Sequence, residues 1–160
     1  MNSLFETPVT LSLDRMNVAF RVYKHPGEVK SLEQAAIERG QQPNQIVRSI
    51  IFRLSDGEYI MILVAGKKQI SWPNIRKYLG VSRISMAREE EILEHTGYPI
   101  GAVSPFGLPK PMRILVDESV FDEREISIGS GVRNTTVMMK SEDLRVALGN
   151  VEIGCFVCRE

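Results

Sequence analysis

The spacing of apolar and polar positions predicts short helices that alternate with strands. Residues 32–39 place apolar side chains at helical spacing, and Ser31 followed by Gln34 forms a capping box before them. Gly40 is the residue type that commonly ends a helix. We therefore predict a short helix over 32–39.

A β-hairpin is predicted next. Ile46 to Leu54 and Tyr59 to Ala65 are rich in Ile and Val, and they flank the step Asp56-Gly57, which is a hairpin signal. The second segment is nearly all apolar, which predicts a strand buried on both faces.

The rest of the chain continues this alternation. We predict helices over 71–79, 87–95 and 141–148, and strands over 112–116, 125–128, 135–139 and 151–157. Hairpins mixed with short helices indicate an α+β fold around a mixed, largely antiparallel sheet with short flanking helices. The pattern is also compatible with a barrel-like closure of that sheet.

The size of the chain fits one unit. A chain of 160 residues with 43% hydrophobic residues is expected to bury one core, so we expect a single domain over 1–160. No window approaches the roughly 18 to 20 apolar residues of a membrane span, and the first ten residues lack a signal-peptide pattern. We expect a cytoplasmic protein with no membrane partner.

The charges give no overall field. Twenty basic and twenty acidic residues cancel, which excludes the global positive footprint that holds a protein along a long stretch of nucleic acid. A nucleic-acid partner would have to be bound by a few cationic side chains at one site.

Cys155 and Cys158 form a lone Cys-x-x-Cys pair, the spacing of half a zinc site or of a redox pair. No second pair exists, and His25 and His95 lie far away in the sequence. Two reduced structural cysteines are the expected case, with no metal and no cofactor.

The residues from Thr96 to Gly107 gather glycines and prolines directly after a predicted helix. Glycine lets the main chain approach a ligand, and proline fixes φ, so this segment predicts a preformed loop that presents backbone groups. The alternative is a plain structural crossover.

Arg48 is an unusual member of its predicted strand, because it shares a face with Ile46, Ile50 and Phe52. Its head either extends to water at the sheet edge or meets an anion in a cavity. Arg53, on the opposite face, is expected to be solvated.

A second glycine-rich turn covers Gly129 to Asn134, between two predicted strands. It matches neither the phosphate-binding loop nor the dinucleotide motif. It is either a plain hairpin turn or a source of hydroxyl and amide donors for a phosphate or carbonyl.

The sequence offers no nucleophile and base pair. His25 precedes Pro26-Gly27 in a predicted loop, where we expect it to be exposed, and His95 stands near a helix end, where it suits the helix dipole.

Three segments in order, 45–50, 96–107 and 126–133, resemble the YbaK and prolyl-tRNA synthetase insertion-domain family of aminoacyl-tRNA deacylases. The resemblance spans roughly Val18 to Leu148. It includes the Gly-x-x-x-Pro loop of the family, which corresponds to Gly101 to Pro105 here.

The resemblance implies a site without a protein nucleophile, in which a pocket positions the ester and a water while backbone amides stabilise the oxyanion. It assigns catalysis to Arg48 and Gly101. It assigns substrate binding to a further set of residues: Ala102, Ser104, Pro105, Ser130, Gly131 and Arg133.

Departures from the family pattern bear on activity and specificity. Arg48 replaces the family lysine, which keeps the charge in a bulkier, planar head. Ala102 replaces a common glycine, and Gly129-Ser130 reverses the usual order of serine and glycine. An added methyl shifts selectivity by about 1 to 3 kcal/mol.

The expected function is hydrolysis, in trans, of a small misattached residue such as Cys or Ala on proline tRNA. The partners implied are the acceptor end of an aminoacyl-tRNA and a synthetase. The alternative is a non-catalytic module that binds an aminoacylated end, a nucleotide or an amino acid. A small redox or zinc protein built on Cys155 and Cys158 is the third.

Overall fold

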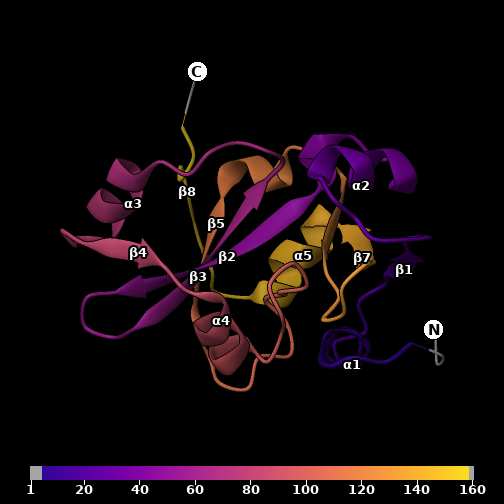
Figure 1. Cartoon of the computed structure of the whole chain (residues 1–160), viewed down its shortest axis with the longest axis horizontal. Coiled ribbons are helices and arrows are strands. Elements are labelled where there is room, and N and C mark those ends of the chain that lie inside the picture. The colour runs from indigo at the N-terminus through magenta and orange to yellow at the C-terminus, as the bar shows by residue number, and fades with distance from the viewer. Residues whose placement is uncertain (1–4, 159–160) are drawn as a thin grey trace.

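The computed structural model describes residues 5–158, which form an α+β domain with mixed and antiparallel sheets, as predicted (Figure 1). The helices are α1 (Pro8–Arg15), α2 (Leu32–Arg39), α3 (Trp72–Leu79), α4 (Glu89–Thr96) and α5 (Ser141–Leu148), with 3-10 turns at Pro43–Gln45 and Glu118–Phe121. The strands are β1 (Arg21–Lys24), β2 (Val47–Leu54), β3 (Tyr59–Ala65), β4 (Ile84–Met86), β5 (Arg113–Asp117), β6 (Glu125–Gly129), β7 (Thr135–Lys140) and β8 (Glu152–Gly154).

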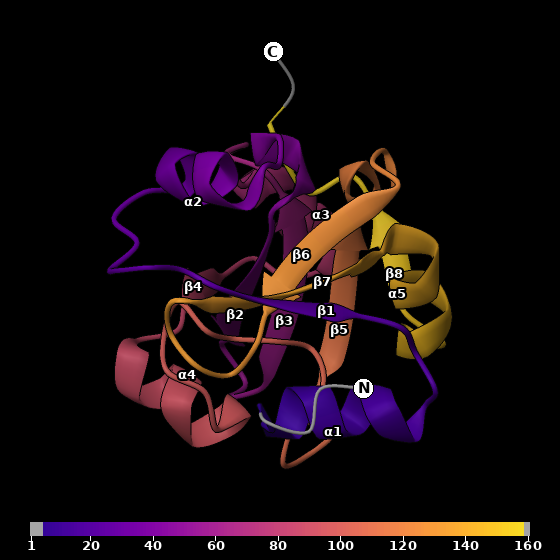
Figure 2. The ribbon, with the colours of Figure 1, turned by 90° about the vertical axis from the view of Figure 1, so that its right-hand side faces the viewer.

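The strands form two sheets and not a closed barrel, so the barrel-like alternative does not hold for the described residues. A three-stranded antiparallel sheet has the order β1-β7-β6, and a five-stranded mixed sheet has the order β4-β2-β3-β5-β8. In the larger sheet β3 pairs with β5, and β5 with β8, in parallel. Figure 2 shows the small sheet lying across the larger one.

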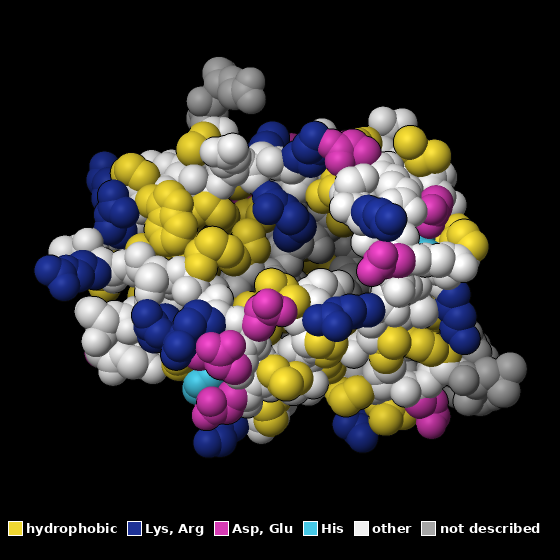
Figure 3. All heavy atoms as spheres, in the orientation of Figure 1, with side chains coloured by type: hydrophobic (Ala, Val, Ile, Leu, Met, Phe, Trp, Pro, Cys, Tyr) yellow, Lys and Arg dark blue, Asp and Glu magenta, His cyan; other side chains and the backbone are white. Residues whose placement is uncertain are grey.

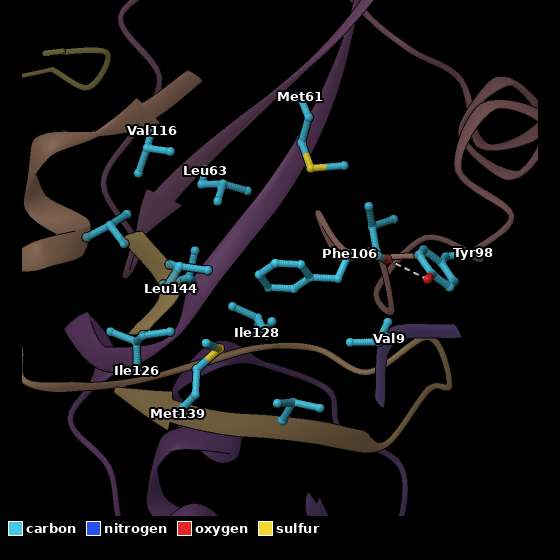
Figure 4. Close-up of a cluster of buried hydrophobic side chains, with 14 of the residues drawn as sticks. Val9, Met61, Leu63, Tyr98, Phe106, Val116, Ile126, Ile128, Met139 and Leu144 are labelled. Carbon is cyan, nitrogen blue, oxygen red and sulfur yellow. Dashed lines mark hydrogen bonds between the residues drawn. The ribbon is translucent and has the colours of Figure 1, made fainter. Parts of the chain in front are cut away.

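The main core fills the space between the two sheets. Alternation along β2 sends Val47 and Ile51 to this side, where they meet Ile126 and Ile128 of β6. Figure 4 shows this cluster, with the hydroxyl of Tyr98 donating to the Phe106 carbonyl at 2.6 Å. A second cluster under α3 covers the other face of the larger sheet and contains Phe52, Ile62 and Phe156. As predicted, β3 is buried on both faces.

Local sequence signals explain most boundaries. The Ser31 hydroxyl accepts from the Gln34 amide at the start of α2, and Gly40 closes that helix in a left-handed conformation. The structure adds α1, β1 and β4, which were not predicted. The C-terminal strand is shorter than predicted: only Glu152–Gly154 pairs with β5, and Val157 makes a separate bridge to Ile70.

Among residues 5–158, none of the helices combines the length and the apolar character that crossing a bilayer demands.

Candidate functional site

A cavity of about 320 Å³ lies along the open edge of β2. β4 pairs with β2 over Phe52–Leu54, and Ile46, directly before β2, bridges to Ser127 of β6, so the cavity lies beside the part of β2 between these two pairings. The walls come from this edge, from α4, from the loop after α4 and from β6, and they include Val47, Ser49, Ile51, Ile92, Val103 and Ile128. The lining is therefore mostly apolar, as is typical of a ligand site.

The Gly/Pro loop forms one wall of this inner cavity through Ile100, Gly101 and Val103. Gly101 is exposed and has φ +91°, a conformation that favours glycine. Its backbone N–H has no hydrogen-bond acceptor among the described residues. The Gly101 amide is thus free to donate to a ligand.

A second hollow, of about 590 Å³, adjoins the first and is walled by α2, the segment before it and the β6–β7 turn. We call it the outer groove. Arg39, Arg48, Ile100 and Gly101 line both spaces. Four cationic side chains and one carboxylate line the groove: Lys30, Arg39, Arg48, Arg133 and Glu28. Figure 3 shows Lys and Arg side chains around a hollow on this face.

Arg48 and Gly101 thus line one shared cavity, as the sequence-based hypothesis requires. The Arg48 head, however, is tied to main chain outside both spaces. Its Nε donates to the Gly66 carbonyl at 2.8 Å and its Nη2 to the Lys68 carbonyl at 2.5 Å. Burial lowers the pKa of Arg48, but a guanidinium remains charged at neutral pH.

Arg133 is exposed on the wall of the outer groove, where its Nε donates to the Ile100 carbonyl at 3.0 Å. It therefore ties the β6–β7 turn to the Gly/Pro loop and still offers its remaining donors to the groove.

The other predicted substrate-binding residues brace the loop and do not line either space. The Ser104 hydroxyl accepts from the Phe106 amide, and the Ser130 hydroxyl bonds to Thr135 within its own turn. The amide of Gly131 donates to the Ala102 carbonyl at 3.0 Å, which joins the two glycine-rich segments. A role in substrate binding stays a prediction for this set: Ala102, Ser104, Pro105, Ser130 and Gly131.

Ser49 is a cavity residue that the sequence reasoning missed. Its Oγ is buried and has no hydrogen-bond partner in the described structure. Strand alternation places it with Val47 and Ile51, which was the available signal. A buried unpaired hydroxyl costs about 1–3 kcal/mol, so a ligand or water that pairs with it is favoured.

His25 is buried, which contradicts the expectation of an exposed loop position. Its Nδ1 lies 2.5 Å from Glu38 Oε1, and its Nε2 accepts from Arg39 Nε at 3.0 Å. Arg39 Nη1 in turn donates to Ser127 Oγ at 2.8 Å. His25 therefore holds the Arg39 head at the junction of the two spaces.

Arg53 is also engaged, and not simply solvated. Its Nη1 donates to Glu91 Oε2 at 2.9 Å, and the Tyr59 hydroxyl donates to the same oxygen. The Arg88 backbone N–H and these side-chain donors lower the pKa of Glu91 to about 2. His95 stacks on Tyr59, with ring centroids 3.8 Å apart. These contacts fix α4, which carries Ile92 to the cavity.

Cys155 is half-buried, Cys158 is exposed, and the two are not joined to each other by a disulfide bond. In residues 5–158 no group of three or more His, Cys, Asp or Glu side chains is arranged to hold a metal ion.

The chain is similar to parts of proline–tRNA ligases. It is 33% identical to that of Thermosipho melanesiensis over 69% of this chain and 19% of the ligase, and 35% identical to that of Thermosipho africanus over 63% and 18%. The chain thus spans about a fifth of the length of these curated relatives.

A solved structure, described as a candidate trans-editing enzyme for prolyl-tRNA synthetase, superposes with a TM-score of 0.79 at 25% identity. The match covers 88% of this chain and 87% of that one. The family model described as the aminoacyl-tRNA editing domain matches residues 26–147, so the chain belongs to the aminoacyl-tRNA editing domain family.

Proposed function

We propose that this protein is an aminoacyl-tRNA deacylase that hydrolyses the ester of a mischarged tRNA in trans. One observation carries the proposal: a mostly apolar cavity meets a cationic groove at Gly101, whose amide is unpaired among the described residues. The family supports the general activity, and the groove supports an anionic nucleic-acid end. A role in translation places the protein in the cytoplasm.

The two spaces fit the two parts of such a substrate. The amino-acid side chain enters the inner cavity, and the terminal nucleotide lies in the outer groove, where cations face its phosphate. The neutral overall charge is consistent with this arrangement, because only the acceptor end needs to be gripped.

The reaction needs positioning more than a protein nucleophile. A water attacks the ester carbonyl carbon, and the developing oxyanion accepts a hydrogen bond from the Gly101 amide, while the positive charge of Arg48, which lines the same cavity, acts on it at longer range. The bond between that carbon and the ribose oxygen then breaks. The ribose oxygen takes up the proton released by the water, giving free amino acid and deacylated tRNA.

The proposed substrates carry a small side chain, Cys or Ala on proline tRNA, which the family resemblance implies. Val47, Ile51 and Val103 offer apolar contacts, while Ser49 supplies one unpaired polar group.

Deacylation of a panel of mischarged tRNAs tests the proposal. We expect turnover above buffer hydrolysis for tRNA charged with a small residue, and much slower turnover for correctly charged proline tRNA. If a synthetase is the partner, adding it to the assay should raise the rate of deacylation. Buffer-level hydrolysis on every member of the panel would overturn the enzymatic assignment.

A non-catalytic binding module is the second candidate, and the position of Arg48 is the observation that favours it. Two backbone carbonyls, of Gly66 and Lys68, hold the guanidinium that replaces the family lysine. Binding of mischarged tRNA without turnover supports this candidate. Stoichiometric zinc in the purified protein would instead support a role for Cys155 and Cys158.

A further inference from the structure

The hydrogen-bonded chain Glu38–His25–Arg39–Ser127 crosses the boundary between the inner cavity and the outer groove. His25 lines the outer groove, Ser127 lines the inner cavity, and Arg39 lines both. The Arg39 guanidinium therefore forms one hydrogen bond to a residue of each space, at 3.0 Å to His25 of the outer groove and at 2.8 Å to Ser127 of the inner cavity.

The protonation of this chain follows from its donors. Arg39 Nε–H can only donate, so His25 Nε2 is the acceptor and the imidazole proton sits on Nδ1, which donates to Glu38. Hydrogen bonds from Gln34 and His25 lower the pKa of Glu38, which keeps it an ionised acceptor. The result is a neutral imidazole that orients a charged guanidinium.

Arg39 is not neutralised by a direct ion pair. No described carboxylate pairs with it, because Glu38 is engaged by His25 and acts on Arg39 only at longer range. Burial lowers the pKa of Arg39 to about 10, so the side chain is still charged at neutral pH. A half-buried cation without a counterion is stabilised when an anion binds beside it. Its Nη2 has no hydrogen-bond partner among residues 5–158 and is free to donate.

Arg39 is better placed than Arg48 to bind an anion at the boundary of the two spaces. The acceptors of the Arg48 head, the carbonyls of Gly66 and Lys68, belong to residues that line neither space. The acceptors of the Arg39 head belong to residues that line one space each. The α2 arginine is thus the cation held at the boundary.

We propose that Arg39 binds the phosphate on the 5′ side of the terminal adenosine, with His25 as the residue that positions it. This inference rests on the proposed substrate. When the amino-acid side chain occupies the inner cavity, the nearest anionic group of the substrate is that phosphate, and a guanidinium matches its geometry with parallel N–H donors.

The test compares two probes that differ only in the phosphate, adenosine 5′-monophosphate and adenosine, by NMR titration at one low salt concentration. The variants are Arg39→Met and Arg39→Lys. The matched control is Arg15→Met, an exposed arginine at the end of α1 that lines neither space.

We expect the wild type and Arg15→Met to prefer the monophosphate, and Arg39→Met to lose about tenfold to hundredfold of that preference. Arg39→Lys should lose less of the preference, because it keeps the positive charge but not the parallel N–H donors of the guanidinium. Adenosine affinity should not change. The inference is overturned if either the wild type lacks the preference or Arg39→Met retains it. An equal loss of affinity for both probes in both Arg39 variants also overturns it, because Arg39 then only supports the structure of the cavity wall.

Deacylation, measured on the same preparations, separates this inference from the proposed function. A wild type that hydrolyses mischarged tRNA but shows no preference for the monophosphate overturns the Arg39 assignment alone. A wild type with the Arg39-dependent preference and no turnover overturns the enzymatic proposal alone.

Discussion

Gly129 at the end of β6 lies directly against the main chain of Val103 in the Gly/Pro loop. A Cβ placed on Gly129 would stand 2.7 Å from the carbonyl carbon of Val103 and 2.9 Å from that of Ala102, which is inside any normal contact. The two glycine-rich segments therefore pack backbone against backbone, and this contact places Val103 on the cavity wall.

Gly129→Ala is expected to destabilise the protein by about 1–3 kcal/mol, because the added methyl meets backbone that has no rotamer to change. Denaturant unfolding measures the loss. Gly27→Ala is the matched control, since a Cβ there meets nothing within 4 Å, and it should stay within about 0.5 kcal/mol of wild type. Equal stability of the two variants would contradict the close packing.

Gly101→Ala is expected to reduce turnover by shifting the amide that we propose to face the ester. A Cβ at Gly101 meets nothing within 4 Å, so its cost comes from φ +91° and is about 1–2 kcal/mol. Gly57→Ala in the β2–β3 turn is the control, because its φ is +89° and its surroundings are equally open.

We expect the Gly57 variant to lose similar stability and to keep full deacylation activity, since it lies at the far end of the hairpin. A fully active Gly101→Ala variant would show that the loop is scaffolding.

Arg48→Ala is expected to lower turnover by roughly 100-fold while the fold survives, because it removes the cavity-lining cation that we propose to stabilise the oxyanion and leaves an apolar strand face. Arg48→Lys should keep much of the activity, since it retains the positive charge. Rates of deacylation and circular dichroism spectra are the measurements. Activity that persists in the alanine variant would make Arg48 a structural clamp for Gly66 and Lys68.

Glu91→Gln is expected to remove a stabilising contribution that depends on pH. The pKa of Glu91 lies at about 2 in the folded protein, below its ordinary value of 4.5, so the ionised form is the one that folding favours. The contribution is fully present above about pH 4.5 and is lost as the pH falls toward 2.

Thermal unfolding of wild type and Glu91→Gln from pH 7 to 2 checks this. The gap between their melting temperatures should be constant down to about pH 4.5 and should then narrow. A gap that does not change with pH would assign the effect of the substitution to packing alone.

Much of the chain is determined by local signals. Ser31 and Gly40 bound α2, Ser71 caps α3, and the alternation in β2 separates Ile51 from Phe52, so these elements were predictable. Thr7 and Pro8 carry the same kind of signal for α1, because the Thr7 hydroxyl accepts from the Thr10 amide and Pro8 is the first residue of the helix. The ordered motifs also identified the family, which the comparisons confirm.

Short edge elements were not predictable in the same way. β1 and β4 have only four and three residues, and each is defined by the strand it pairs with, β7 or β2. A strand of that length has little propensity of its own.

The sequence by itself determined the type and order of most elements, because capping, turn chemistry and hydrophobic spacing act within a few residues. It also placed Gly101 in a preformed loop. Only the tertiary structure decided that His25 is buried, that Arg39 is held between His25 and Ser127, and that Ser49 faces a cavity. These are contacts between segments as many as 88 residues apart, and their free energies depend on neighbours that no local pattern specifies.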